Sequence, residues 1–184
     1  MINNSLNVID LFSGVGGLSY GFYKNKNFKV LAANEILKNM AIAYSLNHPE
    51  VKMYNMDIKY FSKSGFDKDQ KSEEKKVIDI VVGGPPCQAY STVGKRLLDD
   101  PRGKLFQEYY RLLDELKPKF FLYENVSGLL AMRNDLHGHI VKLFESLSYK
   151  VNSPVLNAVD YGVPQIRKRV IITGTKLGRK FEYP

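Results

Sequence analysis

The sequence predicts an α/β protein built on a doubly wound, mostly parallel sheet. Apolar runs of strand length alternate along the 184 residues with amphipathic stretches of helix length. This alternation is typical of strands joined by helical crossovers. Several of the runs are apolar almost throughout, as expected of strands that are covered on both faces. No repeat or linker interrupts the pattern, so residues 1–184 are expected to form one domain.

Each predicted element follows from its local pattern. The apolar runs interpreted as strands are residues 7–12, 28–34, 77–84, 120–125 and 169–175, with a shorter one at 51–57. Stretches with helical spacing of apolar residues are 16–25, 37–47, 105–117 and 135–147. In the third of these, one face carries Leu105, Tyr109, Leu112, Leu113 and Leu116, and Pro118 ends the helix. The charged stretch 62–76 has no apolar period and is expected to be a solvated loop.

Composition narrows the class of protein. The chain carries 27 Lys and Arg against 19 Asp and Glu, a net charge of +8, which favours a polyanionic partner such as nucleic acid. A solubilising surface is the alternative explanation of the same surplus. We expect a cytoplasmic protein, because the sequence has a single cysteine and no secretory signal. We expect no membrane segment, because no apolar run is long enough to cross a bilayer.

The stretch DLFSGVGGLSYGF (10–22) reads as a strand, a glycine turn and the start of a helix. Glycines at 14, 16 and 17 permit close approach of a ligand to the backbone, and a helix N-terminus adds N–H groups. Glu35 ends the next strand, where it can accept ribose hydroxyls. Asp57 follows the short third strand and either binds an adenine amino group or caps the next segment. A nucleotide-type cofactor is predicted, and both a dinucleotide and S-adenosylmethionine fit; purely structural glycines are the alternative.

The only cysteine, Cys87, follows Pro85 and Pro86 directly after a buried strand. The two prolines stiffen the backbone and hold the thiol beyond the sheet, which favours a reactive thiol over one that only packs. Glu124 ends a very apolar strand, where it is either placed to share a proton or bound to a nearby helix N-terminus or arginine. Asn125 can hold neighbouring backbone in place.

Arginines alternate in the stretch YGVPQIRKRVIITG (161–174). At strand period Arg167 and Arg169 face the same way, which suits contacts to phosphates or to a base. A charged strand edge that discourages aggregation is the alternative.

Together these stretches closely resemble the C5-cytosine DNA methyltransferases. The matching segments are DLFSGVGGLSYGF, NE (34–35), MDI (56–58), GGPPCQAYSTVGKR, DPRGKLFQEYYRLL, YENVSGLL and YGVPQIRKRVIITG. They run in the family order from residue 7 to about 175. The resemblance implies the Rossmann-like fold of S-adenosylmethionine-dependent methyltransferases, DNA binding with base flipping, and DNA methylation of the kind used in restriction–modification. No metal is expected.

The resemblance also implies roles for individual residues. Cys87 would attack C6 of a flipped cytosine, Glu124 would share a proton with N3, and Arg169 would hold O2. The residues implied in S-adenosylmethionine binding are Phe12, Gly14, Gly16, Glu35, Asp57, Ile58, Pro85 and Leu105. Those implied in contacts to DNA are Ser91, Lys95, Arg96, Arg102 and Arg167. Residues 88–104 match the family's mobile loop.

The family pattern continues beyond QIRKRVIITGTK into a target-recognition region and C-terminal motifs that this sequence does not contain. A second polypeptide carrying them is therefore expected, and a truncated fragment, a silent remnant that only binds nucleic acid or cofactor, and an RNA methyltransferase are the alternatives. A nicotinamide-dependent oxidoreductase is disfavoured, because GGPPCQ and the QxRxR pattern have no part in hydride transfer.

Overall fold

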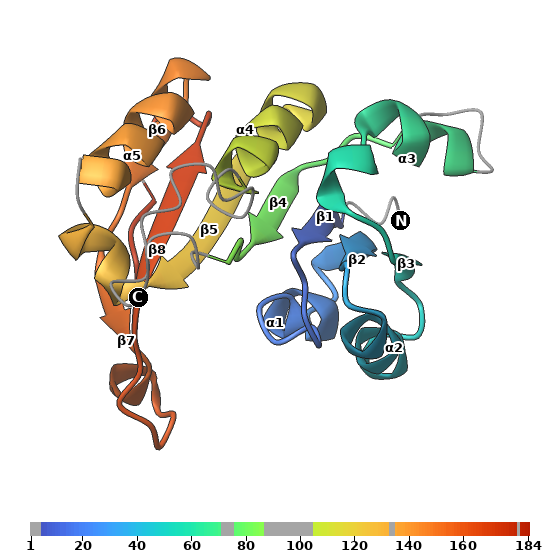
Figure 1. The fold of residues 1–184 in the computed structure, drawn as a ribbon, viewed down its shortest axis with the longest axis horizontal. Helices are drawn as coiled ribbons and strands as arrows, with labels where there is room; N and C mark the ends of the chain where they lie inside the picture. The colour runs from blue at the N-terminus through green and yellow to red at the C-terminus, as the bar shows by residue number, and fades with distance from the viewer. Residues whose placement is uncertain (1–4, 71–75, 87–104, 133–134, 180) are drawn as a thin grey trace, which may run out of the picture.

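The protein is built around one mixed sheet with helices on both faces (Figure 1). The computed structural model describes residues 5–70, 76–86, 105–132, 135–179 and 181–184. The strands are β1 (Leu6–Leu11), β2 (Phe28–Asn34), β3 (Lys52–Tyr54), β4 (Ile80–Gly83), β5 (Phe120–Val126), β6 (Lys150–Asn152), β7 (Val155–Asn157) and β8 (Lys168–Thr175). The α-helices are α1 (Tyr20–Lys24), α2 (Lys38–Asn47), α3 (Lys63–Asp69), α4 (Leu105–Leu116) and α5 (Leu136–Ser146).

The strand order is β3-β2-β1-β4-β5-β8-β6, with β7 also paired to β8. Strands β1 to β5 pair in parallel, whereas β8 runs antiparallel to β5, β6 and β7. The predicted doubly wound, mostly parallel α/β sheet is confirmed, and the antiparallel part is confined to one edge.

Alternation along β1 explains the two layers of the core. Ile9 and Leu11 belong to the larger buried cluster, which α3, α4 and α5 cover. Val8 faces the opposite way, toward the smaller cluster that includes Tyr44 of α2. Figure 1 shows the same division, with α4 and α5 on one face of the sheet and α1 and α2 on the other.

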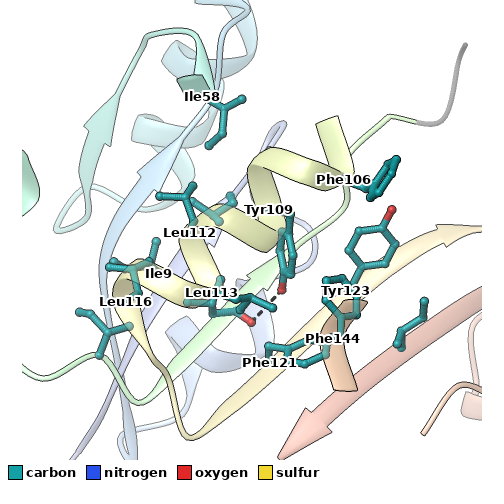
Figure 2. Close-up of a cluster of buried hydrophobic side chains, with 14 of the residues drawn as sticks. Ile9, Ile58, Phe106, Tyr109, Leu112, Leu113, Leu116, Phe121, Tyr123 and Phe144 are labelled. Atoms are coloured by element: carbon teal, nitrogen blue, oxygen red, sulfur yellow. Dashed lines mark hydrogen bonds between the residues drawn. The ribbon is translucent and has the colours of Figure 1, made fainter. Parts of the chain in front are cut away.

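Helix α4 is the main support of the sheet on the first of these faces. Its predicted apolar face is confirmed: Tyr109, Leu112, Leu113 and Leu116 are buried, and Leu105 is half-buried against the same cluster. Figure 2 shows Tyr109 pointing into this cluster. The Tyr109 hydroxyl hydrogen-bonds two strand carbonyls, those of Val81 in β4 and Leu122 in β5.

Some elements differ from the prediction. The expectation of a solvated loop over 62–76 is wrong for residues 63–69, which form α3; Ser62 caps this helix through the N–H of Gly65, and Phe66 is fully buried. One buried aromatic in seven residues is too little apolar period to mark a helix in the sequence. Helix α1 begins only at Tyr20, because the backbone from 12 to 19 forms the turn. Strands β6 and β7 were not predicted, being three residues long.

In the part of the chain that the structure describes, no helix combines the length and apolar character needed to cross a membrane.

Candidate active site

The parallel strands end together along one edge of the sheet. Their register aligns one row across five strands, formed by Tyr54, Asn34, Leu11, Gly83 and Tyr123. In three of these strands, the residue that follows this row is a predicted site residue: Phe12, Glu35 and Glu124. Ligands of doubly wound sheets bind at this carboxyl edge. The fold therefore brings most of the predicted site residues to one place.

The glycine turn after β1 has an unusual backbone. Phe12 has φ 55°, Gly14 has φ 55° and Gly16 has φ 94°. A positive φ at a bulky residue such as Phe12 costs energy and is found preferentially at functional sites. Gly16 also packs on a buried ring, because a Cβ there would lie 2.2 Å from Cε1 of His48. Of these two glycines, only Gly14 lies beside open space.

Glu35 links this turn to the end of β2. Its Oε2 accepts the N–H of Gly14 at 2.9 Å, and its Oε1 accepts the N–H of Leu37 at 2.8 Å. The residue is 8% exposed, and its carboxylate oxygens retain lone pairs for further donors. A buried carboxylate beside a glycine turn is the arrangement predicted for binding the hydroxyls of a ribose.

Two asparagines that the sequence analysis missed hold the ends of β2 and β3 together. Asn34 Nδ2 donates to the carbonyls of Tyr54 and Met56, and Asn55 Nδ2 donates to those of Glu35 and Ile36. Ile36 itself is 60% exposed directly beyond Glu35, so it offers apolar surface at the same edge. Asn34 lies in the NE segment (34–35), but the sequence does not show what either asparagine binds, because the partners lie about 20 positions away in the chain.

Asp57 caps the 3₁₀ helix η1 (Ile58–Tyr60), as one of the two alternatives predicted. Its Oδ1 accepts the N–H of Lys59 at 3.0 Å, and its Oδ2 lies 3.2 Å from Nζ of the same lysine. The hydrogen bond from the Lys59 backbone lowers the pKa of Asp57, so the carboxylate is ionised at neutral pH. The side chain of Ile58 is buried in the larger core cluster.

Strand β4 leads into the turn Gly84–Pro86. Pro85 is buried, and its carbonyl accepts a hydrogen bond from Asn125 Nδ2 at 3.1 Å. A Cβ on Gly84 would lie 3.0 Å from Oε2 of Glu124, so a larger residue there would push that carboxylate away from the turn by a few tenths of an ångström. The expectation that Asn125 holds neighbouring backbone is confirmed. The turn and the end of β5 thus form one unit immediately before Cys87.

Glu124 and Arg169 form an ion pair, with 2.7 Å between Oε1 and Nε. The two side chains are 27% and 24% exposed, so the pair lies at the surface of the edge rather than in the core. A carboxyl oxygen and a guanidinium side by side can together contact the adjacent polar atoms of one heterocyclic base. The sequence left open that Glu124 binds a nearby arginine, and the structure shows that this arginine is Arg169.

Of the residues predicted to contact DNA, only Arg167 lies in the described part of the chain. Arg167 is exposed and precedes β8, with its N–H donated to Asn157 Oδ1. It lies in the segment between β7 and β8 that projects away from the sheet (Figure 1). Cys87, Ser91, Lys95, Arg96 and Arg102, together with the predicted mobile loop 88–104, lie outside the described residues.

A buried polar cluster beneath the glycine turn was also missed. Asp10 is completely buried, and burial raises its pKa to about 7, although the nearby hydroxyls of Ser19 and Tyr44 oppose the rise. Neither carboxylate oxygen of Asp10 has a hydrogen bond of ordinary geometry. His48 stacks on Tyr44, and burial lowers the pKa of its imidazole. Asp10 was visible in the motif, but the sequence does not show which face of β1 it occupies.

The sequence matches one known protein family over nearly its whole length. The model of the C-5 cytosine-specific DNA methylases matches residues 6–183, which is nearly the whole chain. The chain belongs to this family.

Relatives and solved structures agree with the family. The chain is 42% identical to the type II methyltransferase M.NgoPII of Neisseria gonorrhoeae, over 98% of this chain and 52% of that protein. It is 37% identical to M.AquIA of a Picosynechococcus strain, over 96% of this chain and 75% of that protein. A crystal structure of a Spodoptera frugiperda DNMT2 mutant superposes with a TM-score of 0.76 at 25% identity, covering 98% and 53% of the two chains. The chain thus spans about half the length of relatives such as M.NgoPII.

Proposed function

We propose that this chain is the catalytic and cofactor-binding part of a DNA (cytosine-5) methyltransferase. The observation that carries the proposal is the position of the Glu124–Arg169 pair, which lies beside the turn that leads into Cys87. A base-binding pair beside the turn that precedes the only cysteine of the sequence is what covalent catalysis on a pyrimidine requires.

The residues of the carboxyl edge fit S-adenosylmethionine. Glu35 offers a buried carboxylate for the ribose hydroxyls, and the open space beside Gly14 admits a ligand next to the backbone. Asp57 and Ile36 would contact the adenine, and Phe12, Gly16, Ile58, Pro85 and Leu105 would complete the pocket. When bound, the cofactor supplies an electrophilic methyl group.

Cytosine C5 must become electron-rich before it can be methylated, and the roles of Cys87, Glu124 and Arg169 follow from this requirement. The thiolate of Cys87 adds to C6 of cytosine, while Glu124 donates a proton to N3 and Arg169 holds O2, so that electron density shifts to C5. After C5 is methylated, transfer of its proton to water re-forms the double bond and expels the sulfur as thiolate, and N3 returns its proton to Glu124. The target atoms are inaccessible in a stacked pair, so the base must leave the duplex.

Contacts to DNA are assigned to Ser91, Lys95, Arg96, Arg102 and Arg167, supported by the net charge of +8. The match covers only about half of relatives such as M.NgoPII, which supports a further proposal, that target recognition resides in a segment outside residues 1–184.

The test is covalent trapping. The chain is incubated with S-adenosylmethionine and duplex DNA containing 5-fluorocytosine, whose fluorine blocks the final elimination. We expect a denaturant-resistant adduct by mass spectrometry that Cys87→Ser abolishes. The second half of a relative is added in a parallel reaction, because the target-recognition segment is proposed to lie outside this chain.

The two reactions separate the outcomes. An adduct in the first reaction assigns catalysis to this chain alone, and an adduct only in the second assigns the missing function to the added segment. No adduct in either reaction, although the chain binds S-adenosylhomocysteine, would overturn the catalytic assignment and leave a cofactor-binding remnant. The same reactions with a 5-fluorocytosine RNA test the alternative substrate.

A further inference from the structure

Arg111, in the middle of α4, connects this helix to the segment that carries Asp57. Its guanidinium bonds two acidic side chains of its own helix, Glu108 and Glu115, at positions i−3 and i+4. Its Nη2 donates to two backbone carbonyls outside the helix, those of Ile58 at 3.1 Å and Phe61 at 3.0 Å. One side chain therefore holds both ends of the turn that Asp57 caps.

Glu115 continues the same network along the chain. Its Oε2 accepts the N–H of Lys63 at 3.1 Å, at the start of α3. The other oxygen of Glu115 bonds Arg111. The segment from 58 to 63 thus has three backbone groups fixed by one ion-paired cluster on α4, while the side chain of Ile58 packs into the core cluster around that helix (Figure 2).

The two neighbouring glutamates keep Arg111 positively charged. Partial burial opposes its ionisation, but Glu108 and Glu115 outweigh this effect, so its pKa is raised. The fixed fork of a guanidinium can bond two carboxylates and two carbonyls at once, whereas an ammonium has fewer donors and no fixed plane. Glu108 and Glu115 in turn orient the fork.

We infer that Arg111 is a positioning residue for the adenosine half of the cofactor, acting through the Asp57–Ile58 turn. This inference rests on the proposed function, which places adenine at Asp57. Arg111 contacts neither the base nor the reacting atoms. Its effect is expected in cofactor affinity, because a ligand group displaced by a fraction of an ångström loses its hydrogen bond geometry.

The experiment measures binding of S-adenosylhomocysteine and of 5′-methylthioadenosine, which lacks the amino-acid part, by calorimetry well below the unfolding temperature. We expect Arg111→Gln to weaken both ligands by the same factor, about 10-fold, which corresponds to roughly one misplaced hydrogen bond. Hydrogen exchange without ligand should show faster exchange at the amides of residues 59–63. Arg111→Lys is the milder variant if Arg111→Gln does not fold.

The matched control is Lys119→Met, which removes another ion pair, 2.8 Å long, between Lys119 and Asp79. Asp79 precedes β4 and so lies at the opposite end of that strand from the site. This variant should bind both ligands as the wild type does. Unchanged affinity in the Arg111 variants, or equal losses in Lys119→Met, would overturn the inference. A wild-type chain that binds neither ligand would instead overturn the cofactor assignment, and with it this role of Arg111.

Discussion

Arg169 Nε lies 2.7 Å from Glu124 Oε1, across the antiparallel pair β5–β8. The register pairs Glu124 with Ile171 and Arg169 with Val126, so the two side chains meet diagonally. The pair lies where the parallel part of the sheet gives way to the antiparallel edge. Because β8 runs antiparallel to β5, the start of β8 lies at the carboxyl edge of the parallel strands, and Arg169 reaches that edge from it.

Glu124→Gln is expected to separate catalysis from stability. Because both partners are about a quarter exposed, loss of the pair should cost at most about 1 kcal/mol of unfolding free energy. Loss of a positioned proton donor should slow adduct formation on 5-fluorocytosine DNA by about 100-fold or more. The measurements are urea unfolding and timed mass spectrometry. A slowdown no larger than the loss of folded protein explains would mean that the pair is only structural.

Asn125→Ala should loosen the turn before Cys87. The buried Pro85 carbonyl loses its donor, which costs about 1–3 kcal/mol. The control is Asn152→Ala, which removes an exposed amide–carbonyl bond to Phe181 and should cost less than about 0.5 kcal/mol. Alkylation of Cys87 by iodoacetamide should change in rate only in the first variant. Identical rates in both variants would contradict the role given to Asn125.

The two glycines of the turn should respond differently to alanine. Gly16→Ala places a Cβ 2.2 Å from the His48 ring at φ 94°, and we expect a loss of about 3 kcal/mol or more. Gly14→Ala meets open space at φ 55°, so its cost should be about 1–2 kcal/mol. Gly14→Ala should nevertheless weaken S-adenosylhomocysteine, because its methyl group enters the proposed pocket. Equal stability losses in urea unfolding would contradict this difference.

The sheet and the carboxyl edge could be predicted because they depend on local patterns. Apolar runs mark strands, and parallel strands bring Glu35 and Glu124 to the same edge whatever their separation in the chain. The glycine turn and the prolines before Cys87 are equally local features.

What could not be predicted depends on partners far apart in the sequence. The spacing of Glu108, Arg111 and Glu115 suggests helical ion pairs, but not that the guanidinium reaches the carbonyls of Ile58 and Phe61. Asn34 and Asn55 are likewise ordinary residues until the register of β2 and β3 is known. Such contacts hold the site in shape without leaving a pattern in the sequence.

The buried Asp10 should make stability depend on pH in a direction opposite to that of most carboxylates. The folded-state pKa is about 7, against 3.8 for an ordinary aspartate, so the folded chain binds the proton more tightly than the unfolded chain. The contribution of protonated Asp10 is therefore complete below about pH 4 and is lost as the pH rises through about 7. Integrated over this range, the loss is about 4 kcal/mol.

Asp10→Asn isolates this effect, because a neutral amide of similar shape does not titrate. The groups that face Asp10 are Ser19, Tyr44 and, more distantly, Glu35. His48 titrates in the same pH range with the opposite sign, since its lowered pKa makes stability rise with pH, but it is present in both proteins and cancels in the difference. In urea unfolding from pH 4 to 8, the stability of Asp10→Asn relative to wild type should increase steadily up to about pH 7 and then level off, because above that pH Asp10 is ionised in both the folded and the unfolded chain. A difference that stays constant over this range would show that Asp10 is ionised in the folded protein.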